Sequence, residues 1–294
     1  MDADALTIRP LQSVAEYRAC EELQQAVWNL DPREVVADHV LLVVQRHGGL
    51  ALGAFEPGGR LVGTLFGFPG IDYNAPGAPW AHISHMMGVL PEWQGRGVGY
   101  RLKRAQREHA LAQGLKLVIW TYDPLESRNA ALNIGKLGAI CRRYVRDMYG
   151  DMRDVVNAGL PSDRFEVEWW IATERVRQRL EGRRGREEAL AAEDVQRANR
   201  VAWRDDGLPT PGETGFAWEG APALVEIPAQ FQQVRRADLE LAGAWRLHTR
   251  ALFEAAFAAG YAVVDFISRV EAGTRRSFYL LQAARNLASF LQCR

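Results

Sequence analysis

The sequence is poor in cysteine and has no excess of charge of either sign. Its 294 residues include three cysteines, Cys20, Cys141 and Cys293, which lie far apart and in no paired metal-ligand spacing. This pattern indicates neither a disulfide framework nor a metal site, and it favours a reducing, cytoplasmic compartment. The 36 basic and 36 acidic residues cancel, so no overall field attracts nucleic acid, and we expect no nucleic-acid partner.

Long apolar runs are also absent. The N-terminus lacks the basic start and apolar stretch of a secretory signal, and no uncharged run approaches the ~20 residues that a membrane span needs. We therefore expect no membrane partner. Hydrophobic residues make up 48% and charged residues 24%, as in a soluble globular protein of one extended domain or two domains.

Local periodicity predicts an α+β protein. Strands are expected at residues 6–10, 50–55, 61–68, 80–90, 115–122, 140–149 and 165–171, and helices at 14–28, 35–46, 100–113 and 127–137. Residues 173–220 shift toward Arg, Glu, Gly and Pro, which indicates a charged linker or surface segment with one short helix near 190–195. A strand at 224–227, a helix at 239–259 and strands at 261–267 and 277–281 follow. The expected domains are 1–172, 173–220 and an α/β extension at 221–294.

One connection concentrates the chemistry. The strand that ends at Leu90 leads into Gln94-Gly95-Arg96-Gly97-Val98-Gly99 and then into a helix. Glycines let a phosphate approach the backbone, and the unpaired N–H groups at a helix start favour an anion. A plain glycine-rich connection without a ligand would also fit. A dinucleotide fingerprint fits less well, because Leu117 stands near the position where an acidic residue is needed.

At these residues the sequence resembles the GNAT superfamily of acyl-CoA N-acyltransferases. Its signature is Gln or Arg, two residues, Gly, one residue, then Gly or Ala, here Gln94, Gly97 and Gly99. The resemblance covers roughly residues 6–172, and the order of elements around the turn also matches. It implies a mixed, mostly antiparallel sheet flanked by helices, to which the C-terminal strand-helix-strand-strand extension is added.

The resemblance also implies a donor site. The strands around Met87 and Trp120 would splay apart and hold the pantetheine of acetyl-CoA, while the glycine turn would hold its pyrophosphate. A backbone N–H of the first strand would stabilise the developing oxyanion. The residues that the resemblance assigns to the donor are Met87, Val89, Gln94, Gly95, Arg96, Gly97, Val98, Gly99, Tyr100, Asn129 and Asn133.

His85 is the leading candidate for the base that deprotonates the acceptor amine. Period-two alternation places it on the same strand face as Ile83, Met87 and Val89, and an imidazole titrates near ~6.5. A hydrogen-bonded structural histidine fits this position equally well, and His82 points to the other face.

Two acidic residues beyond the next strand are weaker candidates. Asp123 and Glu126 could orient the amine instead, but Tyr122-Asp123-Pro124 is also good turn chemistry.

The acid that protonates the leaving thiolate is not evident. Counting back from Lys136-Leu137-Gly138 places Ile134 where many relatives carry a tyrosine, and isoleucine cannot donate a proton. Tyr144 and Tyr122 are candidate replacements, although an aromatic residue on a strand more often packs than catalyses. Coenzyme A thiolate can also leave without a dedicated acid.

Two further features are interpreted as structural. Glutamates interleave the arginines Arg175, Arg177, Arg179, Arg183, Arg184 and Arg186, as on a solvated helix. The apolar stripe of the 239–259 helix predicts a core or a subunit face, so a homodimer is possible.

We therefore expect an N-acetyltransferase that moves an acetyl group from acetyl-CoA directly to a primary amine of a small molecule or amino-acid derivative. A larger acyl-CoA donor, or a non-catalytic acyl-CoA-binding or interaction module, stays open. The acceptor cannot be identified from the sequence, because its binding loops vary within the superfamily.

Overall fold

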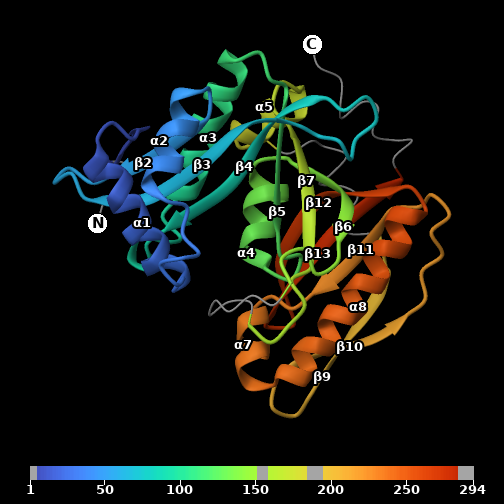
Figure 1. Cartoon of the computed structure of the whole chain (residues 1–294). Helices are drawn as coiled ribbons and strands as arrows, with labels where there is room; N and C mark the ends of the chain where they lie inside the picture. The colour runs from blue at the N-terminus through green and yellow to red at the C-terminus, as the bar shows by residue number, and fades with distance from the viewer. Residues whose placement is uncertain (1–4, 151–157, 184–194, 284–294) are drawn as a thin grey trace. The chain divides into compact units, whose positions relative to one another are not determined.

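The computed structural model describes residues 5–150, 158–183 and 195–283. Contacts divide the chain into two compact units, the first ending at Trp120 and the second beginning at Thr121 (Figure 1). The short helix expected near residues 190–195 falls almost entirely outside the described residues.

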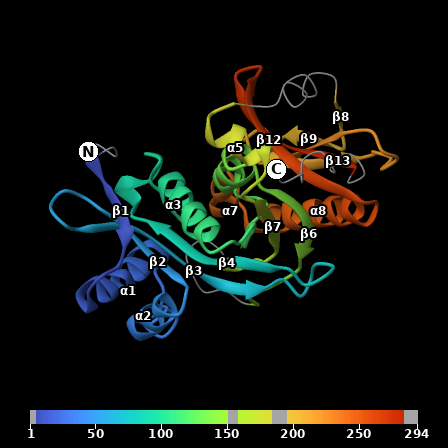
Figure 2. The same cartoon turned by 90° about the horizontal axis from the view of Figure 1, so that it is seen from above.

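The first unit is a sheet with helices on both faces. Its elements are β1 (Thr7–Pro10), α1 (Val14–Trp28), α2 (Asp38–Arg46), β2 (Leu50–Phe55), β3 (Leu61–Ile71), β4 (Trp80–Val89), a 3-10 turn (Pro91–Trp93), α3 (Val98–Ala112) and the start of β5 (Leu117–Tyr122). The strand order is β1-β2-β3-β4-β5, antiparallel except for the parallel pair β4 and β5. Helices α1 and α2 cover one face and α3 covers the other (Figure 2).

Local signals explain where these helices begin and end. Ser13 caps α1 by accepting a hydrogen bond from the N–H of Glu16, and Asn29 ends the helix in the left-handed conformation. Both helical layers press apolar residues onto the sheet, where Leu41, Leu65 and Leu102 are fully buried. Trp93 and Val98, which flank the glycine turn, belong to the same hydrophobic core.

The second unit is also a mostly antiparallel sheet with helices. Its elements are the rest of β5, α4 (Ser127–Ala130), a π-helix (Ala131–Lys136), β6 (Ile140–Val145), β7 (Arg164–Trp170), α5 (Glu174–Leu180), β8 (Gln196–Arg197), β9 (Asn199–Trp203), β10 (Pro209–Thr214), β11 (Ala223–Ile227), α7 (Phe231–Ala237), α8 (Leu239–Ala258), β12 (Tyr261–Glu271) and β13 (Thr274–Ala283). The strand order is β7-β6-β12-β13-β11-β8, with β9 and β10 as a separate pair. Mixed α+β architecture was predicted, and both units confirm it.

Helix α8 contributes its apolar stripe to the core of the second unit. Trp245, Phe253 and Ala256 are fully buried. The ring of Phe253 lies 4.6 Å from that of Phe165 on β7 and 5.4 Å from that of Tyr279 on β13. The stripe is thus a core face, one of the two roles expected for it.

Several elements of the structure differ from the sequence expectations. Residues 173–220 contain α5, β8, β9 and β10, which their polar composition concealed, and α7 was not foreseen. Strand β12 of the extension pairs with β6 through Val263 and Cys141, so residues 140–145 pack with the C-terminal strands. The compact units therefore divide before residue 172, while a functional domain at 1–172 stays a prediction.

The prediction that the arginines lie on a solvated helix is wrong for two of them. Arg179 is nearly fully buried and lies 3.0 Å from the carboxylate of Asp265, while Arg175 donates to the carbonyl oxygens of Gly138 and Val264. Arg177 does pair with Glu174 at the surface as expected. Arg184 and Arg186 lie outside the described residues.

Candidate active site

The glycine turn is held at both ends by buried side chains. Trp93 and Val98 are buried, while Gln94, Gly95, Arg96 and Gly97 between them are exposed. Gly97 immediately precedes α3 with φ 83°, in the left-handed region that favours glycine. As a glycine, this N-cap residue has no side chain to cap the start of α3. Its first N–H groups and the positive end of its dipole are therefore available to an anion.

The predicted residues on either side of Gly97 lie together around the turn. The Gln94 side chain donates to the carbonyl oxygen of Val89 at 3.0 Å, and Arg96 Nε donates to that of Glu92 at 3.0 Å. The first contact ties the turn to the end of β4, and the second ties it to the 3-10 turn Pro91–Trp93. Helix α3 begins at Val98, so Val98, Gly99 and Tyr100 form its first turn, two residues earlier than expected.

Strands β4 and β5 pair over a short distance only. The parallel ladder joins His82 to Val118 and Ile83 to Ile119, although β4 runs on to Val89. On its other edge, β4 stays paired with β3, where Met87 faces Leu65. The half-buried Met87 and Val89 therefore lie beyond the end of the β4–β5 ladder, where the resemblance placed the pantetheine.

A β-bulge separates His85 from its neighbours. Ser84 pairs with Gly67 and Met86 with Phe66, which leaves His85 without a partner on β3. Its ring makes an edge contact with that of Phe66 at 5.9 Å. His85 is exposed overall, yet partial desolvation of its ring lowers the pKa of the imidazole. His85 is therefore neutral near pH 7 and can accept a proton.

The bulge also corrects the expected strand face. Ser84 contacts α3 through Lys103, whereas a Cβ at Gly88 would lie 2.9 Å from Trp28 of α1, on the opposite side of the sheet. Strict alternation would put residues 84 and 88 on one face. The predicted common face of Ile83, His85, Met87 and Val89 is therefore wrong, because one extra residue reverses the alternation.

The remaining predicted donor residues belong to the second unit. Asn129 is exposed on α4, whereas Asn133 and Ile134 are buried in the π-helix that follows. Their assignment to the donor stays a prediction. Ile134 is fully buried, so the position that many relatives fill with tyrosine is a core position here.

Tyr144 is already engaged by other side chains. Its hydroxyl donates to the Asp163 carboxylate at 2.6 Å, and Arg250 donates to both oxygens of the same carboxylate at 2.8 Å. Burial, and next the hydrogen bond to Asp163, raises the pKa of Tyr144 well above its ordinary value. Tyr144 is therefore a weaker acid than a free tyrosine.

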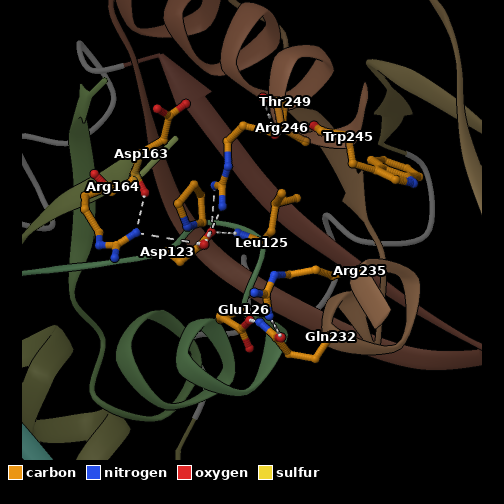
Figure 3. A network of polar contacts seen from close by, with 12 residues as sticks. Asp123, Leu125, Glu126, Asp163, Arg164, Gln232, Arg235, Trp245, Arg246 and Thr249 are labelled. Atoms are coloured by element: carbon orange, nitrogen blue, oxygen red, sulfur yellow. Dashed lines mark hydrogen bonds and ion pairs between the residues drawn. The ribbon is translucent and has the colours of Figure 1, made fainter. Parts of the chain in front are cut away.

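Asp123 is the centre of a buried ion-pair network (Figure 3). Arg246 of α8 donates to its two carboxylate oxygens at 2.8 and 2.5 Å, and Arg164 of β7 approaches to 3.9 Å. The N–H of Leu125 donates to the same carboxylate at 2.8 Å, which is the turn chemistry that Tyr-Asp-Pro suggested. Asp123 therefore has a structural role and is not free to orient an amine.

Glu126 has a different environment at the start of α4. Gln232 of α7 donates to its carboxylate at 2.5 Å, and Figure 3 shows both side chains pointing toward each other. Desolvation, partly opposed by the Gln232 hydrogen bond, raises the pKa of Glu126 above its ordinary value. The Glu126 carboxylate accepts from a neutral amide, whereas the Asp123 carboxylate is paired with an arginine. Glu126 therefore stays a candidate for orienting the acceptor amine.

Neither a metal-binding cluster nor a membrane-spanning helix is found in the described part of the chain. Within residues 5–150, 158–183 and 195–283, no group of three His, Cys, Asp or Glu residues could hold a metal ion. No helix in those ranges is long and apolar enough to cross a membrane. The cytoplasmic location and the homodimer stay predictions.

Strand β4, the left-handed glycine turn and helix α3 lie within a segment that matches a known protein family. Residues 13–138 match the model of the acetyltransferase (GNAT) family. The protein is therefore an acyltransferase, and its N-terminal part is a GNAT acetyltransferase domain. The predicted resemblance to this family is confirmed.

Part of the chain is similar to several solved structures. Naa20 from Chaetomium thermophilum, solved with a bisubstrate analogue, is 20% identical over 55% of this chain and 85% of its own, with a TM-score of 0.43. The ribosomal-protein-S18-alanine N-acetyltransferase from Escherichia coli is 15% identical over 56% and 94%, with a TM-score of 0.42. A GNAT family acetyltransferase from Brucella melitensis, solved with acetyl-CoA, is 18% identical over 40% and 76%, with a TM-score of 0.33. No curated protein matches the chain.

Proposed function

We propose that this acyltransferase is an N-acetyltransferase that moves an acetyl group from acetyl-CoA to a primary amine of a small molecule or amino-acid derivative. The observation that carries the proposal is the junction of β4 and α3. There an exposed left-handed glycine turn leads to a helix start that no side chain caps. Such a start binds phosphate through its N–H groups and its dipole.

The thioester would lie along β4 beyond the end of its ladder with β5. A backbone N–H between Met86 and Val89 would then stabilise the oxyanion that develops on the thioester carbonyl. Direct transfer needs a neutral amine held close to that carbonyl. The unpaired position of His85 on the bulge, next to this segment, supports it as the group that removes the ammonium proton.

A screen of acceptors tests the proposal. Acetyl-CoA would be incubated with the full chain and with amino acids, polyamines, aminoglycosides or peptides, and free thiol would be measured. Thiol release that depends on one class of amine is expected. Binding of acetyl-CoA without turnover across the whole panel would instead favour a non-catalytic module, and a preference for longer acyl groups would correct the donor.

Gly97→Glu tests donor binding at the turn. A side chain is strained at φ 83°, and the carboxylate would stand where the phosphate belongs. We expect the affinity for coenzyme A to fall at least ~10²-fold in calorimetry, with turnover lost. The matched control, Gly59→Glu, at another exposed left-handed glycine outside the turn, should bind normally. Normal binding by Gly97→Glu would remove the phosphate from this turn.

His85→Ala tests the base. Donor affinity should stay near the wild-type value, while turnover near neutral pH should fall by ~10²-fold or more. The defect should shrink at high pH, because the acceptor amine then deprotonates in solution. A wild-type rate at every pH would leave His85 a purely structural residue.

A further inference from the structure

Lys103 is a buried amine in the first unit, between α3 and the sheet. Its side chain is 2% exposed. Nζ donates to Ser84 Oγ on β4 at 2.9 Å and to Gln106 Oε1 on α3 at 3.1 Å, and it lies 3.6 Å from the ring centroid of Trp120 on β5. Three groups from three elements therefore converge on one nitrogen.

No carboxylate neutralises this amine. Among the described residues Lys103 takes part in no ion pair; the imidazole of His82 on β4 lies near it, and that of His109 on α3 contacts the His82 ring at 5.9 Å. Desolvation lowers the pKa of Lys103 well below its ordinary value. Desolvation, His109 and Lys103 likewise lower the pKa of the buried His82 to about 3, so this imidazole adds no charge near neutral pH. Burying an amine without a counterion costs stability, and such sites are often functional.

The position of Ser84 connects this amine to the donor site. Ser84 follows Ile83, the last β4 residue paired with β5, and Trp120 follows Ile119, its partner. Lys103 and Ser84 therefore meet where the two strands stop pairing. Because Ser84 Oγ accepts from Lys103, its own proton is available, and no acceptor for that proton is found in the described part of the chain.

We propose that Lys103 and Ser84 form a proton relay that protonates the coenzyme A thiolate as it leaves. This inference rests on the proposed function and fills the acid role that Ile134 leaves open. Tyr144 is engaged by Asp163, and the buried Tyr122 hydroxyl lies 3.2 Å from that of Tyr279. Ser84 is the group that would touch the thiolate, and Lys103 supplies the proton through it.

The proposed transfer exchanges one C–S bond for one C–N bond, with one net proton passing from the acceptor nitrogen to sulfur. The neutral amine attacks the thioester carbonyl carbon, a C–N bond forms, and the carbon–sulfur bond breaks with its electron pair on sulfur. The Ser84 O–H proton passes to sulfur while the Lys103 ammonium passes a proton to Ser84 Oγ. The second proton of the acylated nitrogen is lost to solvent, from which Lys103 is reprotonated. Gln106 Oε1 and the Trp120 face, both electron-rich, stabilise the ammonium form between turnovers.

An ordinary lysine is a poor acid for this task. The pKa of an unperturbed lysine is about 10.4, against about 8.5 for a thiol. Desolvation moves the Lys103 ammonium toward the thiol, and general acids work best when their pKa lies near the operating pH.

The test compares three variants of the full chain with an amine that the wild type acetylates. Lys103→Met removes the titrating nitrogen, Ser84→Ala removes the relay oxygen, and Lys116→Met makes the same change at an exposed lysine. Turnover would be measured from about pH 6 to 10, together with coenzyme A affinity. We expect the first two variants to lose ~10²-fold or more in turnover near neutral pH, to keep their affinity, and to lose the high-pH decline of the wild-type profile. Lys116→Met should match wild type.

Each other outcome is decisive. The relay is overturned if Lys103→Met keeps the wild-type turnover and pH profile. It is also overturned if turnover falls by the same factor at every pH, because that result indicates a structural role. If Lys103→Met instead loses the decline of turnover at low pH, Lys103 acts as a base, and its assignment as the acid is overturned. If Lys103→Met does not fold, Ser84→Ala decides alone by the same criteria. A wild-type chain that releases no thiol with any amine overturns the proposed function, and this inference with it.

Discussion

The two units bury positive charge in different ways. In the second unit, Arg246 and Arg179 are each nearly fully buried against a buried aspartate, Asp123 and Asp265. In the first unit, Lys103 is buried to the same degree but contacts a hydroxyl, an amide and an aromatic face. A paired cation keeps its charge and holds distant segments together, whereas an unpaired amine gives up protons easily. The presence or absence of a counterion therefore distinguishes the structural arginines from Lys103, which is a candidate reactive group.

Breaking the ion-pair network around Asp123 should have the largest effect on the free energy of unfolding. Asp123→Asn keeps the shape of the side chain but leaves Arg246 buried without a counterion, which typically costs about 3–5 kcal/mol. Urea unfolding at pH 7 would measure the change. Asp206→Asn, which removes one of the two carboxylates that the exposed Arg204 contacts, should have little effect on stability. Equal effects of the two substitutions would contradict the structural role of Asp123.

A smaller, pH-dependent effect is expected at Asp163. Burial would raise the pKa of this carboxyl, but the hydrogen bonds from Arg250 and Tyr144 outweigh it and lower the pKa below its ordinary value. The stabilisation is therefore complete above the unfolded-state pKa of about 3.9 and is lost as the pH falls through the lower folded-state pKa. Asp163→Asn should cost about 2 kcal/mol at pH 7 and less at pH 3, as measured by urea unfolding. The same cost at both pH values would mean that ionisation of Asp163 does not contribute.

The smallest effect on stability should come from Lys103→Met. Because the folded-state pKa of Lys103 is lowered, unfolding takes up a proton at pH values between the folded-state and the unfolded-state pKa. The wild-type chain should therefore gain stability as the pH rises toward the unfolded-state value of about 10.4. At pH 7 we expect Lys103→Met to be within about 1 kcal/mol of wild type or more stable, with any advantage shrinking by pH 10. A loss of several kcal/mol at pH 7 would show that the amine is needed for folding.

The local part of the fold could be predicted from the sequence. Helix α1 follows from its apolar spacing and its Ser13 cap, and the order of strands around the glycine turn follows from short-range alternation. Lys103 was not predicted as a site residue, although the sequence carries a signal for it. It and Gln106 fall on the buried stripe of α3 with Leu102 and Ala110, where polar side chains are unexpected. A charged residue on the apolar stripe of an amphipathic helix indicates a buried polar site.

The sequence by itself determined the family of the N-terminal part, because the signature at Gln94, Gly97 and Gly99 lies within six consecutive residues and needs no distant partner. Tertiary structure decided the rest. The bulge at His85 depends on the register of β4 against β3, and one extra residue reverses the faces that alternation had assigned. The pairing of Asp123 with Arg246 joins positions 123 residues apart, and neither residue type nor spacing distinguishes that partner from the chain's other arginines. Lys103 meets Ser84 only when α3 packs on the sheet, since desolvation and proton transfer depend on distances that local periodicity does not encode.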